Sequence, residues 1–275
     1  MSALGSYGDG TVEISELRDQ VALLTLLRPA QRNAMNAALI AGLHEAFAAL
    51  QSDRSVRVVV LTGAGQGFCA GLDLKEGASP AEVEGLGRAQ AGLVVQQSIA
   101  RLVPTMRGLR QPIIAAVNGA ASGGGLALAL ASDIRIAARS ARFNVAFVRV
   151  GLSACDIGVS WLLPRLLGAS RAYELMLTGR FVPSDEAERI GLVTRVVDDG
   201  DLLDAALETA ALIVANSPFG VHMTKEVMWS QLEVGSMQAG IDLENRTQLL
   251  ASTTGDMVEA MQAFLEKRPP RFDDQ

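Results

Sequence analysis

Short apolar runs alternate with helical patterns along the first two thirds of the chain. Continuous runs rich in Val, Ile, Leu and Ala predict buried strands at 21–27, 56–62, 113–117 and 134–137. After the first run, apolar residues recur on one face of a predicted helix that ends near Leu50, and Asn36 precedes it as a candidate N-cap. This alternation favours a layered α/β core with parallel strand pairing.

Three further helices are expected within this part of the chain. Residues 78–110 have mixed polarity, and Pro112 follows them as a helix breaker. Residues 126–131 are apolar throughout. A short helix at 185–190 follows Ser184, which is a candidate N-cap.

Helical patterns follow one another in the last third of the chain. They predict helices at 202–214, 219–232, 237–250 and 255–266. Apolar residues such as Leu202, Leu207 and Phe264 exceed what one small core can bury, which favours contacts with other subunits. We therefore divide the chain into a core, residues 1–200, and a helical oligomerisation region, residues 201–275.

The composition argues against several classes of protein. Of the 275 residues, 49% are hydrophobic and 20% are charged, which is typical of a folded chain. A net charge of −6 argues against a general binder of nucleic acid or anionic membranes. We see neither a signal peptide nor an apolar run of roughly 18 residues that would span a bilayer. The two cysteines, Cys69 and Cys155, are expected to be reduced thiols in a cytoplasmic protein, and the two distant histidines make a metal site unexpected.

Two glycine-rich loops are the strongest candidates for chemistry. Residues 67–74 follow the second predicted strand, and residues 118–125 join the third strand to its helix. Glycine permits a close approach of two backbones, and the start of a helix presents unpaired N–H groups. If the loops face each other, they can hold an oxyanion between two N–H donors. The alternative interpretation is a pair of tight turns without chemistry.

Other kinds of site fit the sequence less well. The second loop matches part of a dinucleotide-binding pattern, but in the middle of the chain. Ser122 as a hydrolase nucleophile needs a histidine base, yet His44 is expected on a helix and His222 in the distant helical region. Cys155 has no evident base nearby and is more simply an inert thiol.

Six segments resemble the crotonase superfamily, also called the enoyl-CoA hydratase/isomerase family. They are LRPAQRNAMN (27–36), VVVLTGAGQGFCAGLDL (58–74), PIIAAVNGAASGGGLALALASDIRIA (112–137), LLPRLLGASRAYELMLTGR (162–180), EAERIGLVTRVV (186–197) and FLEKRPPRF (264–272). Together they span nearly the whole chain in order. The resemblance implies a spiral of ββα units followed by helices that build a homotrimer or a dimer of trimers. It also implies an acyl-CoA thioester as the ligand.

The resemblance also implies roles for particular residues. The thioester oxygen is expected between the backbone N–H groups of Leu72 and Gly124. Six positions match contacts of coenzyme A in the family: Arg32, Ala70, Asp73, Leu74, Phe264 and Lys267. The last two are expected to reach coenzyme A on a neighbouring subunit, and Arg32 is equally well explained as a solvated charge. Coenzyme A enters as part of the substrate, with no separate cofactor and no metal.

The sequence departs from the family at both glutamates that its hydratases use. Ala127 and Phe147 stand at these positions, and neither side chain can transfer a proton. Asp156 remains, in a loop that faces the acyl group in this family, where one base could shift a double bond. Asp156 could instead cap a helix that begins at Ile157. We therefore expect an isomerase rather than a standard hydratase, with a non-catalytic acyl-CoA binding protein as the alternative.

Overall fold

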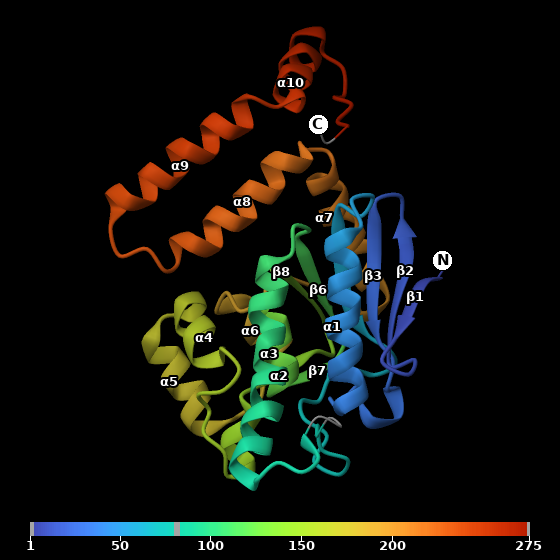
Figure 1. Ribbon diagram of the computed structural model, residues 1–275, viewed down its shortest axis with the longest axis vertical. Coiled ribbons are helices and arrows are strands. Elements are labelled where there is room, and N and C mark those ends of the chain that lie inside the picture. The colour runs from blue at the N-terminus through green and yellow to red at the C-terminus, as the bar shows by residue number, and fades with distance from the viewer. Residues whose placement is uncertain (1–2, 80–82, 274–275) are drawn as a thin grey trace.

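A seven-stranded sheet forms the centre of the computed structural model, which describes residues 3–79 and 83–273 (Figure 1). Its strands lie in the order β1-β2-β3-β4-β6-β8-β11. The bounds are β1 Ala3–Tyr7, β2 Val12–Arg18, β3 Val21–Leu26, β4 Val58–Gly63, β6 Ile113–Val117, β8 Ile134–Ala138 and β11 Arg195–Val197. Strands β3, β4, β6 and β8 are the four predicted apolar runs, and they pair in parallel as expected.

A second sheet of short strands lies beside the first. It contains β5 (Gly67–Cys69), β7 (Ala120–Ser122), β9 (Arg142–Asn144) and β10 (Val182–Pro183), in the order β10-β9-β7-β5. The pairs β4–β5, β6–β7 and β8–β9 each contribute one strand to each sheet before the chain turns into helix. This is the spiral of ββα units that the resemblance implies.

Ten α-helices surround or extend from the sheets in the described part of the chain. They are α1 Ala37–Ser52, α2 Arg88–Gly108, α3 Gly124–Ala131, α4 Val159–Leu167, α5 Ala169–Thr178, α6 Ser184–Arg189, α7 Leu202–Val214, α8 Pro218–Gln231, α9 Met237–Ser252 and α10 Gly255–Glu266. Asn36 caps α1 as predicted, since its side chain accepts a hydrogen bond from the N–H of Leu39.

Two details of the predicted helices are wrong. Helix α2 begins at Arg88, ten residues later than expected, although residues 80–82 lie outside the described residues. Ser184 is the first residue of α6 rather than its cap. Pro183 stands at the N-cap position, no side chain caps the helix, and the Ser184 hydroxyl instead donates to the carbonyl oxygen of Arg139 at 2.7 Å.

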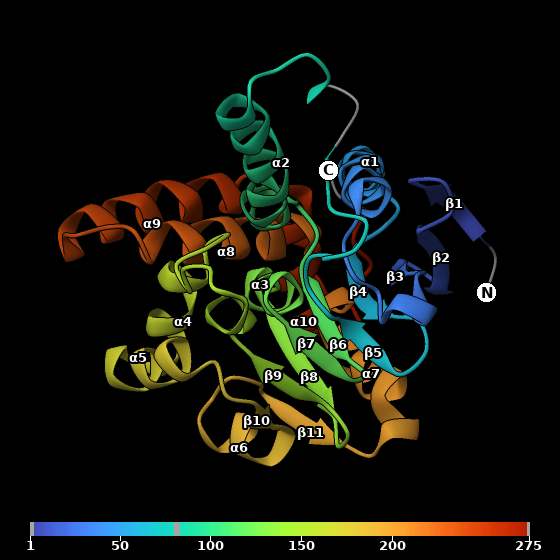
Figure 2. The same ribbon diagram turned by 90° about the horizontal axis from the view of Figure 1, so that it is seen from below.

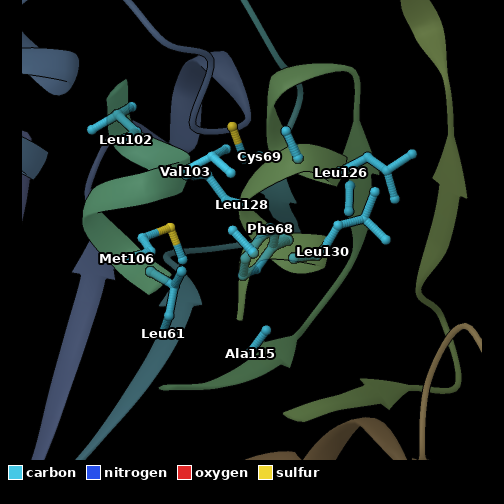
Figure 3. Close-up of a cluster of buried hydrophobic side chains, with 14 of the residues drawn as sticks. Leu61, Phe68, Cys69, Leu102, Val103, Met106, Ala115, Leu126, Leu128 and Leu130 are labelled. Atoms are coloured by element: carbon cyan, nitrogen blue, oxygen red, sulfur yellow. The ribbon is translucent and has the colours of Figure 1, made fainter. Parts of the chain in front are cut away.

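The main hydrophobic core lies where α2 and α3 pack on the strands of both sheets. Leu61, Phe68, Met106, Leu126 and Leu130 meet there from four different elements (Figure 3). A smaller apolar cluster on the other face of the main sheet is covered by α7. Burial of both faces explains why the central strands are continuous apolar runs.

The C-terminal helices α8, α9 and α10 extend away from this core (Figures 1 and 2). Helix α8 is held by Lys225, whose Nζ lies 2.9 Å from a carboxylate oxygen of Asp133 and donates to the carbonyl oxygens of Met106 and Gln111. Burial lowers the pKa of Lys225, and the neighbouring Asp133 carboxylate opposes that shift. Trp229 of α8 donates to the other oxygen of Asp133 at 2.8 Å.

A stack of charged and aromatic groups joins α2, α4 and α8. The guanidinium of Arg107 lies between the rings of Trp161 and Trp229, 4.8 Å and 4.4 Å from their centroids.

Within the described residues no single helix is long and apolar enough to cross a bilayer. The bent helix pair 199–214 and 218–231 passes that test by length and composition alone.

Candidate functional site

The structure brings the two predicted glycine loops into contact. Gly71 adopts the left-handed region with φ +90°, which favours glycine. A Cβ added there would lie 2.8 Å from the carbonyl oxygen of Ser122 and 3.3 Å from the backbone nitrogen of Gly124. A Cβ on Gly124 would lie 3.1 Å from the sulfur of Met35. The loops therefore approach this closely because Gly71 lacks a side chain, and Gly124 in turn leaves room for the side chain of Met35.

Two backbone N–H groups at this contact can serve as oxyanion donors. Met35 and Leu72 form an isolated parallel bridge, in which the Met35 N–H donates to Gly71 and the Asp73 N–H donates to Met35. These bonds flank Leu72 and leave its own N–H outside the ladder. Gly124 is the first residue of α3, so its N–H has no partner within the helix and lies at the positive end of the helix dipole. The predicted donors thus belong to two loops in contact.

Arg32 and Ala70, both predicted to contact coenzyme A, are also neighbours. The N–H of Ala70 donates to the carbonyl oxygen of Arg32 at 3.0 Å. Arg32 has φ +50° and its side chain is exposed. Leu74 follows on the same loop with 69% of its surface exposed. An exposed cation beside an open loop is a surface on which a phosphate group can bind.

The buried carboxylate of Asp73 stabilises the first glycine loop through contacts with Arg28 and with backbone N–H groups. One of its oxygens lies 3.0 Å from the guanidinium of Arg28, and the other accepts the backbone N–H groups of Lys75 and Glu76. These two backbone donors, with Arg28, hold the pKa of Asp73 below its usual range. The buried side chain of Asp73 is therefore occupied within the loop rather than offered to a ligand.

Phe264 and Lys267 are not brought to the loops within one chain. Phe264 lies on α10 with 83% of its surface exposed, and Lys267 follows as the C-cap of that helix. Figure 1 places α10 at one end of the molecule, away from β7, which lies within the second glycine loop. A contact of these residues with the predicted site would require a second copy of the chain.

Apolar side chains stand at the two positions where the resemblance implies the glutamates of hydratases. Ala127 lies in α3 with 1% of its surface exposed. Phe147 lies in a 3-10 segment, Ala146–Val150, and is 8% exposed. Its ring is 3.5 Å from the position of a Cβ on Gly123, directly before α3. The surroundings of the contacting loops are therefore apolar on this side.

Asp156 lies half-buried in the loop between this 3-10 segment and α4. The loop starts where the Leu152 N–H donates to the carbonyl oxygen of Phe147 at 3.0 Å. Oxygen Oδ1 of Asp156 accepts the N–H of Ile157 at 2.8 Å and the side-chain amide of Gln96 on α2. The alternative role as a helix cap is wrong, because α4 begins only at Val159 and Gly158 is its N-cap.

The competing catalytic groups lie apart from one another in the described part of the chain. Ser122 is part of β7, whereas His44 on α1 makes a 2.9 Å contact with a main-chain carbonyl of α2. His222 on α8 is 3.7 Å from a glutamate one turn further on. Burial raises the pKa of Cys69 to about 12, and Cys155 is exposed. None of these contacts builds a nucleophile and base pair.

A sizeable cavity lies away from the glycine loops. Its volume is about 820 Å³, and its lining includes Leu162, Ile213, Lys225 and Trp229 from α4, α7 and α8. None of the predicted site residues lines it. The contact geometry of the loops, rather than cavity volume, identifies the candidate site.

Comparison with known proteins identifies the family. Residues 16–275 match the family model for enoyl-CoA hydratase/isomerase. The chain is 46% identical over 264 residues to the probable enoyl-CoA hydratase EchA12 of Mycobacterium tuberculosis, covering 96% of this chain and 93% of the relative. It is 39% identical over 260 residues to 1,2-epoxyphenylacetyl-CoA isomerase of Escherichia coli, covering 94% and 97%.

A solved structure supports the same assignment. The crystal structure of a probable enoyl-CoA hydratase/isomerase from Mycobacterium abscessus matches with a TM-score of 0.90 at 40% identity, covering 96% of this chain and 99% of that chain. The chain therefore belongs to the enoyl-CoA hydratase/isomerase family, within the crotonase superfamily. The predicted family and fold class are confirmed.

Sequence reasoning missed three residues that shape the candidate site. Met35 pairs with the first loop and contacts the second, and its position in the motif at 27–36 is the signal that could have indicated it. Gln96 contacts Asp156 from α2, and Ile157 has φ +36°. The sequence carries no local signal for either, because both depend on packing between distant segments.

Proposed function

We propose that this protein shifts a carbon–carbon double bond in an enoyl-CoA thioester, with Asp156 as the single base. The observation that carries the proposal is the distribution of polar and apolar groups. Buried Ala127 and Phe147 stand at the two glutamate positions, whereas Asp156 offers a half-buried carboxylate in the loop that starts at Phe147. The N–H groups of Leu72 and Gly124 would hold the thioester oxygen.

The proposed reaction moves one proton and needs no water. The carboxylate of Asp156 removes a proton from the carbon next to the double bond, and the electrons of that C–H bond move toward the thioester carbonyl. The resulting enolate oxygen is stabilised by the N–H groups of Leu72 and Gly124, each donor contributing about 3 kcal/mol in comparable sites. The protonated Asp156 then returns the proton to the far carbon of the conjugated system, which completes the shift.

Hydration makes a different demand on the site. Adding water to a double bond requires one group to activate the water and another to deliver a proton, each contributing about 10²–10⁴-fold. Buried Ala127 and Phe147 provide neither group and leave an apolar surface there. One carboxylate suffices for isomerisation, since the same group can take and return the proton.

Coenzyme A would enter as part of the substrate, without a separate cofactor. We propose that its nucleotide end meets the loop of Ala70 to Leu74, with Arg32 near a phosphate. Phe264 and Lys267 would come from a neighbouring subunit. This proposal is supported by the exposure of Arg32, Leu74 and Phe264.

We propose that the chain assembles as a homotrimer or a dimer of trimers. The support is the apolar surface of the extended helices, since Leu249, Met261, Phe264 and Leu265 each expose more than half of their surface. Light scattering at micromolar concentration should give three or six chains per particle. A monomer would contradict the proposal.

The activity is tested by incubating the protein with trans-2-, trans-3- and dienoyl-CoA thioesters and following absorbance and product identity. Isomerised product is expected, and Asp156→Asn should lower its rate by about 10²-fold or more with little change in acyl-CoA affinity. Hydrated product as the main outcome contradicts the proposal. Undiminished turnover by Asp156→Asn shows that another group transfers the proton.

A non-catalytic acyl-CoA binding protein is the second candidate. The loss of both glutamates, at Ala127 and Phe147, is the observation that favours it. Tight binding of acyl-CoA without turnover of any tested thioester would establish this function instead.

A further inference from the structure

Helix α2 reaches the Asp156 loop at two points on one face. Near its middle, the side-chain amide of Gln96 donates to Oδ1 of Asp156. Two turns further on, Val103 packs against the same loop, 3.3 Å from the position of a Cβ on Gly158. Residues seven apart share one face of a helix, so α2 lines this loop with a polar contact at Asp156 and an apolar one at Gly158.

The loop itself is held in a strained conformation at this contact. Ile157 is a β-branched residue with φ +36°, a backbone region that such residues rarely occupy. Its N–H donates to Oδ1 of Asp156, and the main-chain carbonyl of Asp156 accepts the N–H of Val159 at 2.8 Å. Strain of this kind persists only where neighbouring contacts fix it, and it is concentrated at functional sites.

Both donors converge on one oxygen of the Asp156 carboxylate. Gln96 and the Ile157 N–H use Oδ1, so the carboxylate is fixed in rotation and Oδ2 lies outside both hydrogen bonds. The partner is a neutral amide, which orients the carboxylate without forming an ion pair. Such orientation is worth most when a group must meet a substrate atom in a single geometry.

We propose that Gln96 is a positioning residue, which holds Oδ1 of Asp156 so that Oδ2 is presented to the acyl carbon that loses its proton. The inference rests on the proposed function, because it assumes that Asp156 is the base. In this role Gln96 acts only through its contact with Asp156. It therefore affects the rate of the chemical step rather than the binding of the thioester.

The test compares Gln96→Met with Gln97→Met. Met retains the length of the side chain and removes the donor, and Gln97 is an exposed neighbour on the same helix. Gln96→Met should lower kcat by about tenfold with KM within about twofold, which is the scale of one lost orienting hydrogen bond. Gln97→Met should retain the wild-type kcat. An unchanged kcat in Gln96→Met, or a loss that appears only in KM, overturns the inference.

A double-mutant cycle separates positioning from a general structural effect. In the Asp156→Asn background, Gln96→Met should cause no further loss of kcat, because its only route to the reaction is already removed. Multiplicative losses in the double variant overturn the inference. If Asp156→Asn alone turns over like wild type, the base assignment fails, and the inference fails with it.

Amide hydrogen exchange provides a readout that needs no turnover. In the wild type the Ile157 N–H is bonded to Asp156, and Gln96→Met should speed its exchange by about fivefold while Gln97→Met does not. If no thioester is turned over, the proposed function fails alone, and faster exchange in Gln96→Met still supports Gln96 as the residue that orients Asp156. Equal exchange in both variants overturns that role whatever the activity.

Discussion

Replacement of Gly71 by alanine tests whether the two contacting loops form the oxyanion site. A methyl group at this position would lie 2.8 Å from the carbonyl oxygen of Ser122, whereas ordinary contacts begin at 3.4 Å. One loop must therefore move by about 0.6 Å. The same methyl group would lie 3.3 Å from the nitrogen of Gly124, one of the two proposed donors.

The expected loss of activity follows from this displacement. Misplacement of reacting groups by about 1 Å can cost about 10²-fold, and loss of one oxyanion donor costs about 10²–10³-fold. A shift near half of that distance should lower kcat/KM by about 10- to 100-fold. Alanine at φ +90° also strains the backbone of Gly71, at a cost of about 1–2 kcal/mol of folding stability.

Gly191→Ala is the matched control for the backbone strain that an alanine causes at a positive φ. Gly191 has φ +81°, and a Cβ there would meet no atom within 4 Å. Gly71→Ala should lose at least as much stability as Gly191→Ala in urea denaturation, because it adds the clash with Ser122 to the same backbone strain, but only Gly71→Ala should lose kcat/KM for an enoyl-CoA that the wild type isomerises. If folded Gly71→Ala retains wild-type kcat/KM, the loop contact is not the oxyanion site.

Three further outcomes follow from buried groups. One thiol per chain, that of exposed Cys155, should react with Ellman's reagent at pH 8 in the native protein, whereas Cys69 should react only after unfolding, because burial raises its pKa to about 12. Because the pKa of Asp73 is lowered in the folded state, its carboxylate stabilises the fold above about pH 4, and this stabilisation should be lost as the pH falls through the folded pKa. In urea denaturation, the free energy of unfolding of Asp73→Asn should therefore fall less steeply with decreasing pH than that of the wild type. Lys225→Met leaves the partly buried carboxylate of Asp133 without this cation, although Trp229 and the N–H of Ile113 still donate to it. It should therefore lower the free energy of unfolding by about 3 kcal/mol, and a loss below about 1 kcal/mol would show that this ion pair does not hold α8.

The main sheet could be predicted from the sequence, but the second sheet could not. Strands β3, β4, β6 and β8 are buried on both faces and therefore appear as continuous apolar runs. The strands of the second sheet have two or three residues, too few for any periodicity, and β5 and β7 lie within the glycine loops. The sequence pattern places the start of α2 too early, because residues 78–87 have the same mixed polarity as the helix itself. The first turns of this helix do not pack on the core and are largely exposed.

The contact between the two glycine loops could be predicted because its signal is local. Glycines in a loop and at the start of a helix are visible in sequence, and the contact between Gly71 and Gly124 agrees with that interpretation. The contact between Gln96 and Asp156 joins residues 60 positions apart, so it depends on how α2 packs. No pattern along the chain encodes such a contact.

The stack around Arg107 makes the protein's own fluorescence a local probe. The chain has two tryptophans, Trp161 and Trp229, and both rings lie against this one guanidinium. All indole emission therefore originates at the junction of α2, α4 and α8. An emission change on heating reports separation of α8 from the core, and comparison with the loss of helical circular dichroism distinguishes detachment of the C-terminal helices from unfolding of the whole chain.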